Sequence, residues 1–223
     1  MIPWVHLDSA KIPGGGELRL MRRGAEFSIM SGSIELMNSR LSGSEKALAT
    51  LSGDRIRGRA GPQVLIGGLG MGFTLRAALA DLPADSGVVV AELVPAVVAW
   101  ARGEMAHIFD GSLDDPRVTV REGDVAEAIG AGRAAYDAIL LDVDNGPGGL
   151  NRDANDGLYS AGGLGAARRA LRAGGVLAVW SAGPDAGFAQ RLRKAGFGVE
   201  EVAVRATGGR RGARHVIWLA VAP

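Results

Sequence analysis

The sequence of 223 residues contains no cysteine, which excludes disulfide bridges, thiolate metal sites and cysteine nucleophiles. Its three histidines, His6, His107 and His215, are widely separated, so we expect no histidine-rich metal site and no bound metal. No uncharged apolar stretch approaches the ~18 residues of a membrane-spanning helix. The first residues lack a basic start followed by an apolar run, so we expect no signal peptide. The sequence therefore predicts a cytoplasmic protein without a membrane partner.

The chain also lacks a charge imbalance, because its formal net charge is +1. A basic surface for nucleic acid is therefore not expected. Its hydrophobic content of 47% is ordinary for a folded protein, and its length suits one domain with a small appendage. Glycine is the abundant residue, with 35 copies. Glycine clusters between apolar runs predict turns, some of which contact ligands in α/β proteins.

The N-terminal part reads as a small β structure followed by a helix. Short, partly alternating runs predict a hairpin or meander, and a serine followed by an acidic first turn predicts the helix start. The predicted strands are Glu17–Arg22, Glu26–Met30 and Ser33–Met37, and the predicted helix is Ser42–Leu51, capped by Ser42 or Ser44. We expect a polar connector over Gly53–Gly61 and divide the chain into an N-terminal hairpin with linking helix (1–52) and a Rossmann-like domain (53–223).

From residue 63 onward, short apolar runs alternate with helical segments. Runs without polar alternation are typical of strands buried on both faces of a parallel sheet. The predicted strands are Val64–Gly67, Val88–Glu92, Val118–Arg121, Ala138–Asp142 and Val176–Ser181. The predicted helices are Gly72–Ala80, Pro95–Ala106, Val125–Ala131, Gly157–Arg172 and Asp185–Ala195.

The C-terminal end breaks this alternation, because no helix fits between the strands Gly198–Arg205 and Arg214–Ala222. These two strands should therefore pair antiparallel. The fold class that we predict is α/β, a Rossmann-like class I methyltransferase fold. It has a seven-stranded sheet, whose last strand is antiparallel, and a small N-terminal β-hairpin or meander.

A glycine-rich turn follows the first of the buried strands, at Gly68-x-Gly70-x-Gly72. Residues without Cβ let the backbone approach a ligand, and the following helix offers free N–H groups. Dinucleotide folds favour G-x-G-x-x-G, whereas the spacing here is commoner in S-adenosylmethionine-binding domains. We therefore predict that Gly68, Gly70, Met71 and Gly72 contact the nucleoside. A purely structural glycine turn is the alternative interpretation.

Two acids follow the next two strands. Glu92 lies ~20 residues beyond the glycines, where an acid accepts hydrogen bonds from ribose hydroxyls; the alternative is a solvated or salt-bridged residue. Asp124 is placed to accept from an adenine amino group, and it also fits an ordinary helix N-cap. We include their neighbours Leu93 and Val125 in the nucleoside site, the latter through its backbone N–H.

Asp142 and Asp144 follow the fourth strand. Open α/β sheets bind ligands at the carboxyl ends of their strands, so we predict that both carboxylates are catalytic and that Asp142 also contacts the nucleoside. The alternative is a polar turn, because Asp-Asn-Gly-Pro is typical turn chemistry.

The motifs together resemble the spermidine synthase family. The similarity runs from about Leu18 to Ser181 and rests on segments in family-like order and spacing. These are the strand and glycine turn from Val64 to Arg76, Glu92-Leu-Val-Pro-Ala-Val-Val, Asp115-Pro-Arg-Val, Glu122-Gly-Asp, Tyr136-Asp-Ala-Ile-Leu-Leu-Asp and Leu171-Arg-Ala-Gly-Gly-Val, preceded by Arg40–Ala49.

The resemblance implies that Glu92 binds ribose, that Asp124 binds adenine, and that Asp142 holds and deprotonates an attacking amine. It also implies that the N-terminal strands pair across a homodimer. The chain departs from the family at Met71, where an aspartate usually recognises the aminopropyl group. It departs again in the C-terminal acceptor-binding segment, which has no counterpart.

These observations predict a transferase that uses S-adenosylmethionine or its decarboxylated form and moves a methyl or aminopropyl group to a small-molecule acceptor. The departure at Met71 favours a methyl donor, whereas the family resemblance favours aminopropyl transfer. A non-catalytic homologue that binds a nucleoside or a partner protein is the alternative. An NAD-dependent oxidoreductase is disfavoured by the glycine spacing.

Overall fold

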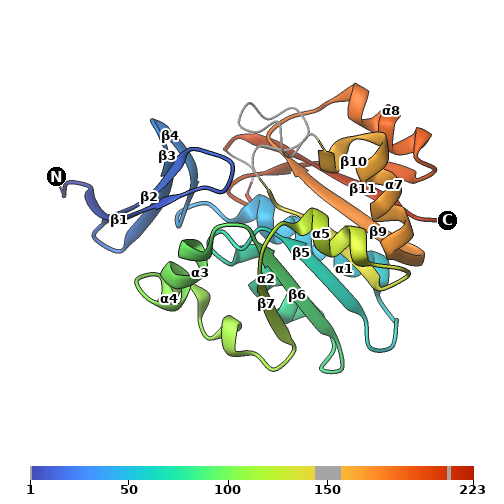
Figure 1. Ribbon diagram of the computed structural model, residues 1–223, viewed down its shortest axis with the longest axis horizontal. Coiled ribbons are helices and arrows are strands. Elements are labelled where there is room, and N and C mark those ends of the chain that lie inside the picture. Colours follow the sequence, from blue (N-terminus) through green and yellow to red (C-terminus); the bar gives the residue numbers. More distant parts are fainter. Residues whose placement is uncertain (1, 144–156, 210–211) are drawn as a thin grey trace.

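The computed structural model describes residues 2–143, 157–209 and 212–223. The chain forms a four-stranded antiparallel sheet, in the order β1-β2-β3-β4, and a seven-stranded sheet, in the order β10-β11-β9-β8-β5-β6-β7. In Figure 1 the small sheet, in blue, lies to one side of the large sheet and its helices. In the described part of the chain, no helix combines the length and apolar character needed to cross a membrane.

The small sheet contains one strand more than the sequence predicted. Its strands are β1 (Val5–Lys11), β2 (Glu17–Arg23), β3 (Glu26–Ser31) and β4 (Ile34–Asn38). The additional strand, β1, pairs antiparallel with β2 along the edge of the sheet. Its residues are exposed or half-buried throughout, so its sequence lacks the apolar alternation by which a strand is predicted.

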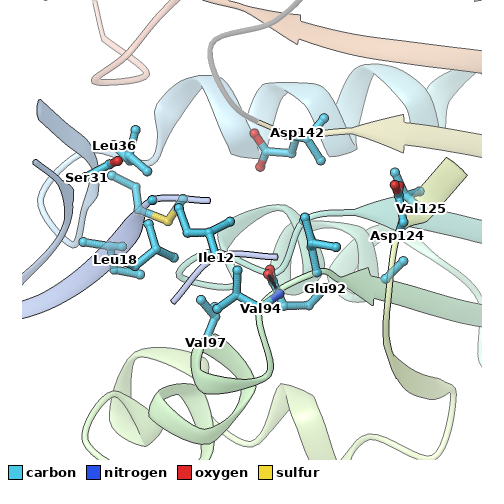
Figure 2. A pocket seen from close by; sticks show the side chains of 18 of the residues that line it. Ile12, Leu18, Ser31, Leu36, Glu92, Val94, Val97, Asp124, Val125 and Asp142 are labelled. Carbon is cyan, nitrogen blue, oxygen red and sulfur yellow. Dashed lines mark hydrogen bonds between the residues drawn. The ribbon is translucent and has the colours of Figure 1, made fainter. Parts of the chain in front are cut away.

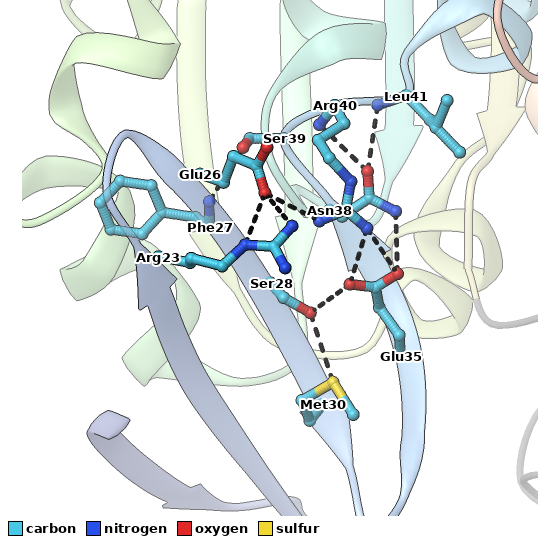
Figure 3. Close-up of polar contacts among 10 residues, drawn as sticks. All are labelled: Arg23, Glu26, Phe27, Ser28, Met30, Glu35, Asn38, Ser39, Arg40 and Leu41. Atoms are coloured by element: carbon cyan, nitrogen blue, oxygen red, sulfur yellow. Dashed lines mark hydrogen bonds and ion pairs between the residues drawn. The ribbon is translucent and has the colours of Figure 1, made fainter. Parts of the chain in front are cut away.

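A polar network covers part of this sheet (Figure 3). The Arg40 guanidinium contacts Glu26 at 3.3 Å and Glu35 at 3.2 Å. Arg23 also pairs with Glu26, and the Ser28 hydroxyl donates to Glu35. Ion pairs with this much solvent contact contribute little each. Their positions connect β2, β3 and β4 with the turn that leads into α1, so they help to fix the strand register.

The large sheet agrees with the predicted fold class. Its strands are β5 (Gln63–Gly67), β6 (Gly87–Glu92), β7 (Val118–Glu122), β8 (Tyr136–Leu141), β9 (Leu171–Ser181), β10 (Gly198–Arg205) and β11 (Arg214–Val221). The strands from β5 to β9 pair in parallel, and β11 is antiparallel to both of its neighbours. The prediction of a seven-stranded sheet with an antiparallel last strand is confirmed.

The helices are α1 (Gly43–Ile56), α2 (Phe73–Asp81), α3 (Pro95–Arg102), α4 (Ala106–Phe109), α5 (Val125–Ala131), α7 (Ala161–Ala170) and α8 (Ala186–Lys194), with a 3₁₀ turn η1 (Ser112–Asp114). Ser42 is the N-cap residue of α1, but neither Ser42 nor Ser44 makes the predicted side-chain cap bond. The helix continues to Ile56 instead of giving way to a connector at Gly53, because Ser52 and Ile56 bury their side chains against the core. The division into two domains near residue 52 stays a prediction.

Two other helix predictions were too long. The segment predicted as Pro95–Ala106 is interrupted, because α3 ends before Gly103, whose φ and ψ of −108° and −107° are not helical. The segment predicted to extend to Arg172 ends at Ala170, because Leu171 already pairs with Tyr136 of β8. Pairing between distant strands overrides the local helical preference there.

The two faces of the large sheet have separate cores. Val64 and Ile66 pack into one core cluster with α1, α2 and α3, whereas Leu65 points to the opposite cluster with α5, α7 and α8. Leu20 and Ile29 of the small sheet belong to the first cluster. The small sheet is therefore packed onto the same core as the large sheet.

Candidate functional site

The glycine turn after β5 is tightly packed. Gly68, Gly70 and Gly72 all have positive φ, at 87°, 51° and 74°, which side chains with Cβ rarely adopt. A Cβ on Gly68 would lie 2.5 Å from the carbonyl oxygen of Asp142, and one on Gly72 would lie 2.4 Å from the ring of Phe109. The turn therefore needs glycine both for its conformation and for close contact with its neighbours.

Glu92 ends β6 beside this turn and is 8% exposed. Its two carboxylate oxygens accept hydrogen bonds from the backbone N–H groups of Leu69, at 2.9 Å, and Val94, at 2.8 Å. Burial raises the pKa of Glu92, and these backbone N–H groups oppose the shift by stabilising the carboxylate. The bonds fix the carboxylate at the mouth of the turn, with lone pairs remaining for further donors.

Asp124 is the N-cap of α5, as the sequence indicated. Its Oδ1 accepts from the Ala126 N–H at 2.8 Å. One oxygen thus caps the helix, and the second oxygen has capacity for another donor. The cap role and the predicted adenine role are compatible in this geometry.

Asp142 follows β8 directly, and its backbone N–H donates to the carbonyl of Gly67 at 2.9 Å. Its carboxylate Oδ2 accepts from the Thr74 hydroxyl at 2.7 Å. Burial, and then repulsion from Glu45, raises the pKa of Asp142 to about 7, although the Thr74 bond favours the charged form. A carboxyl group with this pKa can take up or release a proton near neutral pH.

A cavity of about 220 Å³ lies between the two sheets (Figure 2). Seven of the predicted site residues line it, namely Gly68, Gly70, Glu92, Leu93, Asp124, Val125 and Asp142. Figure 2 shows the three acids on one side and apolar side chains of the N-terminal part on the other, among them Ile12, Leu18 and Leu36. The small sheet thus supplies an apolar wall opposite the carboxylates. We call this space the nucleoside cavity, after the ligand that the sequence predicts for these residues.

A second cavity of about 90 Å³ adjoins it. The two share Leu36, Met37, Gly70 and Asp142. The second cavity is also lined by Met71 and Gly72, which the sequence placed in the site, and by Glu45 and Trp180, which it did not. We call this space the acceptor cavity, after the acceptor that the sequence predicts to meet Asp142, which lines both cavities.

Sequence reasoning had treated Glu45 as a first-turn acid of a helix and had given Trp180 no role. Glu45 lies in the family-like segment Arg40–Ala49, and Trp180 lies near the end of the predicted strand Val176–Ser181. Their meeting in one cavity depends on how α1 and β9 pack, which neither segment shows by itself. The structure brings the nine predicted residues that it describes to the two cavities, and their roles stay predictions. Asp144, the second predicted catalytic residue, lies outside the described residues.

The fold is that of class I methyltransferases. Its large sheet has the order β10-β11-β9-β8-β5-β6-β7 with an antiparallel last strand, and its glycine turn lies beside an acid at the end of β6. Within this fold class the chain is similar in sequence, over part of its length, to polyamine aminopropyltransferases, and similar in fold to spermidine synthases. It superposes on a spermidine synthase from Thermotoga maritima with a TM-score of 0.78 and 19% identity, covering 98% of this chain and 73% of that one. A spermidine synthase in complex with the transition-state analogue AdoDATO gives a TM-score of 0.77, with 19% identity and coverage of 98% and 72%.

In sequence, the chain is 34% identical over 125 residues to a polyamine aminopropyltransferase of Mycobacterium tuberculosis (strain ATCC 25618 / H37Rv). A polyamine aminopropyltransferase of Mycobacterium bovis matches to the same extent. The match covers 54% of this chain but 23% of each relative. No family model matches the sequence.

Proposed function

We propose that this chain is a transferase that moves the aminopropyl group of decarboxylated S-adenosylmethionine to a small amine. The similarity to polyamine aminopropyltransferases supports this reaction class. The observation that carries the choice of donor is the charge of the two cavities. Four carboxylates line them, from Glu45, Glu92, Asp124 and Asp142, and no Lys, Arg or His is among their described lining residues.

This charge favours ligands with positive charge and no anion. Decarboxylated S-adenosylmethionine carries a sulfonium and an ammonium, whereas S-adenosylmethionine carries an additional carboxylate. A pair of charges at about 4 Å contributes roughly 1–4 kcal/mol between bulk water and a protein surface. The carboxylate of the methyl donor would be repelled in these cavities, whereas the aminopropyl donor carries only its sulfonium and its ammonium, which would both be attracted.

The nucleoside cavity suits the adenosine part of the donor. Glu92, fixed by two backbone N–H groups, would accept from the ribose hydroxyls. The Asp124 oxygen that is not needed for the helix cap would accept from the adenine amino group. The apolar side chains of Leu18 and Leu36 would exclude water from the adenine ring.

Asp142 stands between the two cavities and would act on the attacking amine. The neutral nitrogen attacks the carbon beside the sulfonium, so that a C–N bond forms while the C–S bond breaks. The bonding electrons pass to sulfur, which leaves as a neutral thioether, and the amine proton passes to the Asp142 carboxylate. The protein's contribution is therefore proximity, orientation and one proton acceptor.

The acceptor cavity would hold the rest of the amine. Trp180 provides an aromatic wall there, and cations bind favourably over aromatic faces. Its indole N–H is buried and has no hydrogen-bond partner among the described residues. The C-terminal sequence lacks the family's aromatic and acidic residues for holding an amine. Glu45 of α1 and Trp180 of β9 supply an acidic and an aromatic group instead.

Methyl transfer is the second candidate. Met71 is 2% exposed and lines the acceptor cavity, at the position where the family's aspartate recognises the aminopropyl group. An apolar side chain there supplies no partner for the donor's ammonium, which would have to rely on Glu45 or Asp142.

Turnover measured with both donors over a panel of small amines tests the proposal, with mass spectrometry of the products to identify the group transferred. We expect aminopropyl transfer, and a loss of at least about 100-fold for the Asp142→Asn variant, as general base catalysis contributes that much. Methyl transfer alone would favour the second candidate. Binding of nucleoside without turnover of either donor would identify a non-catalytic homologue, and tight NADH binding alone would favour an oxidoreductase.

A further inference from the structure

Three side chains from opposite ends of the sequence form a hydrogen-bonded chain that ends at the acceptor cavity. His215 of β11 lies with its Nδ1 2.9 Å from the Ser44 hydroxyl. The Ser44 hydroxyl in turn lies 2.8 Å from Glu45 Oε2 and donates to it. Glu45 lines the acceptor cavity together with Asp142.

The direction of these bonds follows from the number of protons available. A serine hydroxyl has one proton, and a carboxylate can only accept. Since Ser44 gives its proton to Glu45, its oxygen must accept from His215, so the histidine proton lies on Nδ1. Burial lowers the pKa of His215, which keeps the ring neutral at pH 7 and compatible with this tautomer.

The hydrogen-bonded residues His215, Ser44 and Glu45 lie in a closely packed region. Ser44 is 1% exposed. The Gly43 N–H donates to the carbonyl of Ala206 at 2.8 Å, and a Cβ on Gly43 would lie 1.9 Å from the backbone nitrogen of Gly208. The His215 ring packs edge-on against Trp180, with centroids 4.7 Å apart. The first turn of α1 is thus held against the β10–β11 end of the sheet, which leaves Glu45 little freedom to turn away.

The groups that face Glu45 and Asp142 come from several elements. Asp142 meets Glu45 from α1 and the Thr74 hydroxyl from α2. Glu45 is attracted by the exposed Lys46 and contacts Ser44, and burial raises its pKa. From β4 and β9 the cavity is faced by the uncharged side chains of Asn38 and Trp180. Two like charges therefore share one small cavity without a cation among its described lining residues.

We propose that Glu45 is a second amine-binding carboxylate of the acceptor cavity and that His215 is a positioning residue that holds it there through Ser44. This rests on the proposed aminopropyl transfer, because it assigns the partner of the acceptor's cationic nitrogen. One ammonium group between Glu45 and Asp142 would neutralise the repulsion between them. The carboxylate pair would thus select an amine over a neutral or anionic acceptor of the same size.

The test measures steady-state kinetics with decarboxylated S-adenosylmethionine and 1,4-diaminobutane as the probe acceptor. For Glu45→Gln we expect the KM of the diamine to rise at least about tenfold, the loss of one charged contact, while the KM of the donor stays within about twofold. His215→Leu should raise the diamine KM in the same direction by a smaller factor. His215→Asn, whose amide N–H can replace Nδ1–H, should restore a value close to wild type. Glu104→Gln, an exposed carboxylate paired with Arg22, is the matched control and should change neither KM.

A readout that does not need turnover is the titration of Asp142, followed by carboxyl ¹³C NMR. Glu45→Gln should lower the pKa of Asp142, because it removes a like charge. If the histidine positions Glu45, His215→Leu should also change the pKa of Asp142. A merely structural role of His215 would leave that pKa unchanged. If Glu45→Gln does not fold, Glu45→Asp withdraws the carboxylate by one methylene and should give the same changes.

The two proposals fail in different ways. Wild-type turnover of the diamine, combined with an unchanged diamine KM in Glu45→Gln, would overturn the role of Glu45 and leave the proposed function standing. Loss of affinity in Glu45→Gln with no effect of His215→Leu on either readout would overturn the role of His215. Absence of any aminopropyl transfer by the wild type, with the nucleoside still bound, would overturn both.

Discussion

Asp142 is a residue whose functional setting should cost the fold stability. Its pKa is raised to about 7 in the folded protein, from an ordinary value of 3.8. Between these two values the folded state binds a proton that the unfolded state releases, so stability falls as the pH rises through this window. Above about pH 7 the buried carboxylate is charged and its penalty is complete.

We therefore predict that Asp142→Asn stabilises the protein at pH 8 by ~1–3 kcal/mol, allowing for partial solvent screening of a shift worth about 1.4 kcal/mol per pKa unit. Near pH 5 the gain should be much smaller, because the wild-type carboxyl is then protonated and neutral. Urea unfolding at the two pH values measures the difference. An equal effect at both would contradict the raised pKa.

At Gly68, the absence of a side chain is what the site requires. In Gly68→Ala the new Cβ would press on the carbonyl of Asp142, 2.5 Å away, in addition to the strain of about 1–2 kcal/mol for a positive φ. We expect nucleoside affinity to fall at least about tenfold, since the turn and Asp142 must move apart. Calorimetric titration with decarboxylated S-adenosylmethionine measures this loss.

Gly58 offers the matched control for that substitution. Its φ of +84° is close to the +87° of Gly68, but a Cβ on it would meet nothing within 4 Å. Gly58→Ala should show the backbone strain in its unfolding free energy while keeping wild-type nucleoside affinity. Equal affinity losses in the two variants would mean that the contact with Asp142 is irrelevant.

At the scale of elements, one buried carboxylate connects strands of the large sheet at the end opposite the cavities. Asp137 of β8 is 1% exposed and accepts from Arg59, at 2.8 Å, and Arg172, at 2.7 Å. It also accepts from the backbone N–H of Gln63, at the start of β5. This group thus connects β5, β8 and β9 at the end opposite the cavities.

We predict that Asp137→Ala lowers the free energy of unfolding by ~2–3 kcal/mol, because it leaves a buried backbone N–H and two guanidinium groups without their acceptor. Urea unfolding measures this loss. Glu104→Gln, which removes one exposed ion pair, should cost less than about 1 kcal/mol. A loss for Asp137→Ala no larger than that of the control would show that the connection does not stabilise the sheet.

The elements that could be predicted from sequence are those whose burial is uniform. The strands around the glycine turn are continuous apolar runs, so Val64–Gly67 and Val88–Glu92 were located to within a residue. β1 was missed because neither of its faces is buried, and the end of α7 was misplaced because Leu171 obeys a pairing with β8. The local sequence pattern predicts an element correctly where tertiary pairing does not change the boundaries that the pattern indicates.

The same reasoning explains which half of the site the sequence revealed. Glu92, Asp124 and Asp142 each follow a strand, and strands of a parallel sheet end at a common edge, so position in the sequence predicts position in space. Glu45 and Trp180 reach the acceptor cavity from a packed helix and from the next strand. Their meeting depends on tertiary contacts such as the one between His215 and Ser44, which are separated by 171 residues.

At the scale of the whole molecule, the small sheet both closes a cavity and carries exposed apolar side chains. Leu18 and Ile29 of this sheet line the nucleoside cavity. Away from that cavity, the N-terminal part also carries the exposed large hydrophobic residues found in the described regions. These are Ile2, Val5, Ile34 and Leu41, between 38% and 63% exposed. Exposed apolar side chains concentrated on one part of a molecule are a feature of interaction surfaces.

We predict that this surface pairs two copies of the chain through their N-terminal sheets, as the family resemblance implied. Val5 and Ile34 begin β1 and β4, so lysine at both positions would put charge into the apolar contact. The double variant Val5→Lys/Ile34→Lys should shift the protein to monomers at concentrations where the wild type is dimeric, since burying unpaired charge is unfavourable. Sedimentation velocity over a range of concentrations measures the change. Gln190→Lys, which adds a charge on the exposed face of α8, should leave the dimer intact, and a wild-type chain that stays monomeric throughout would contradict the prediction.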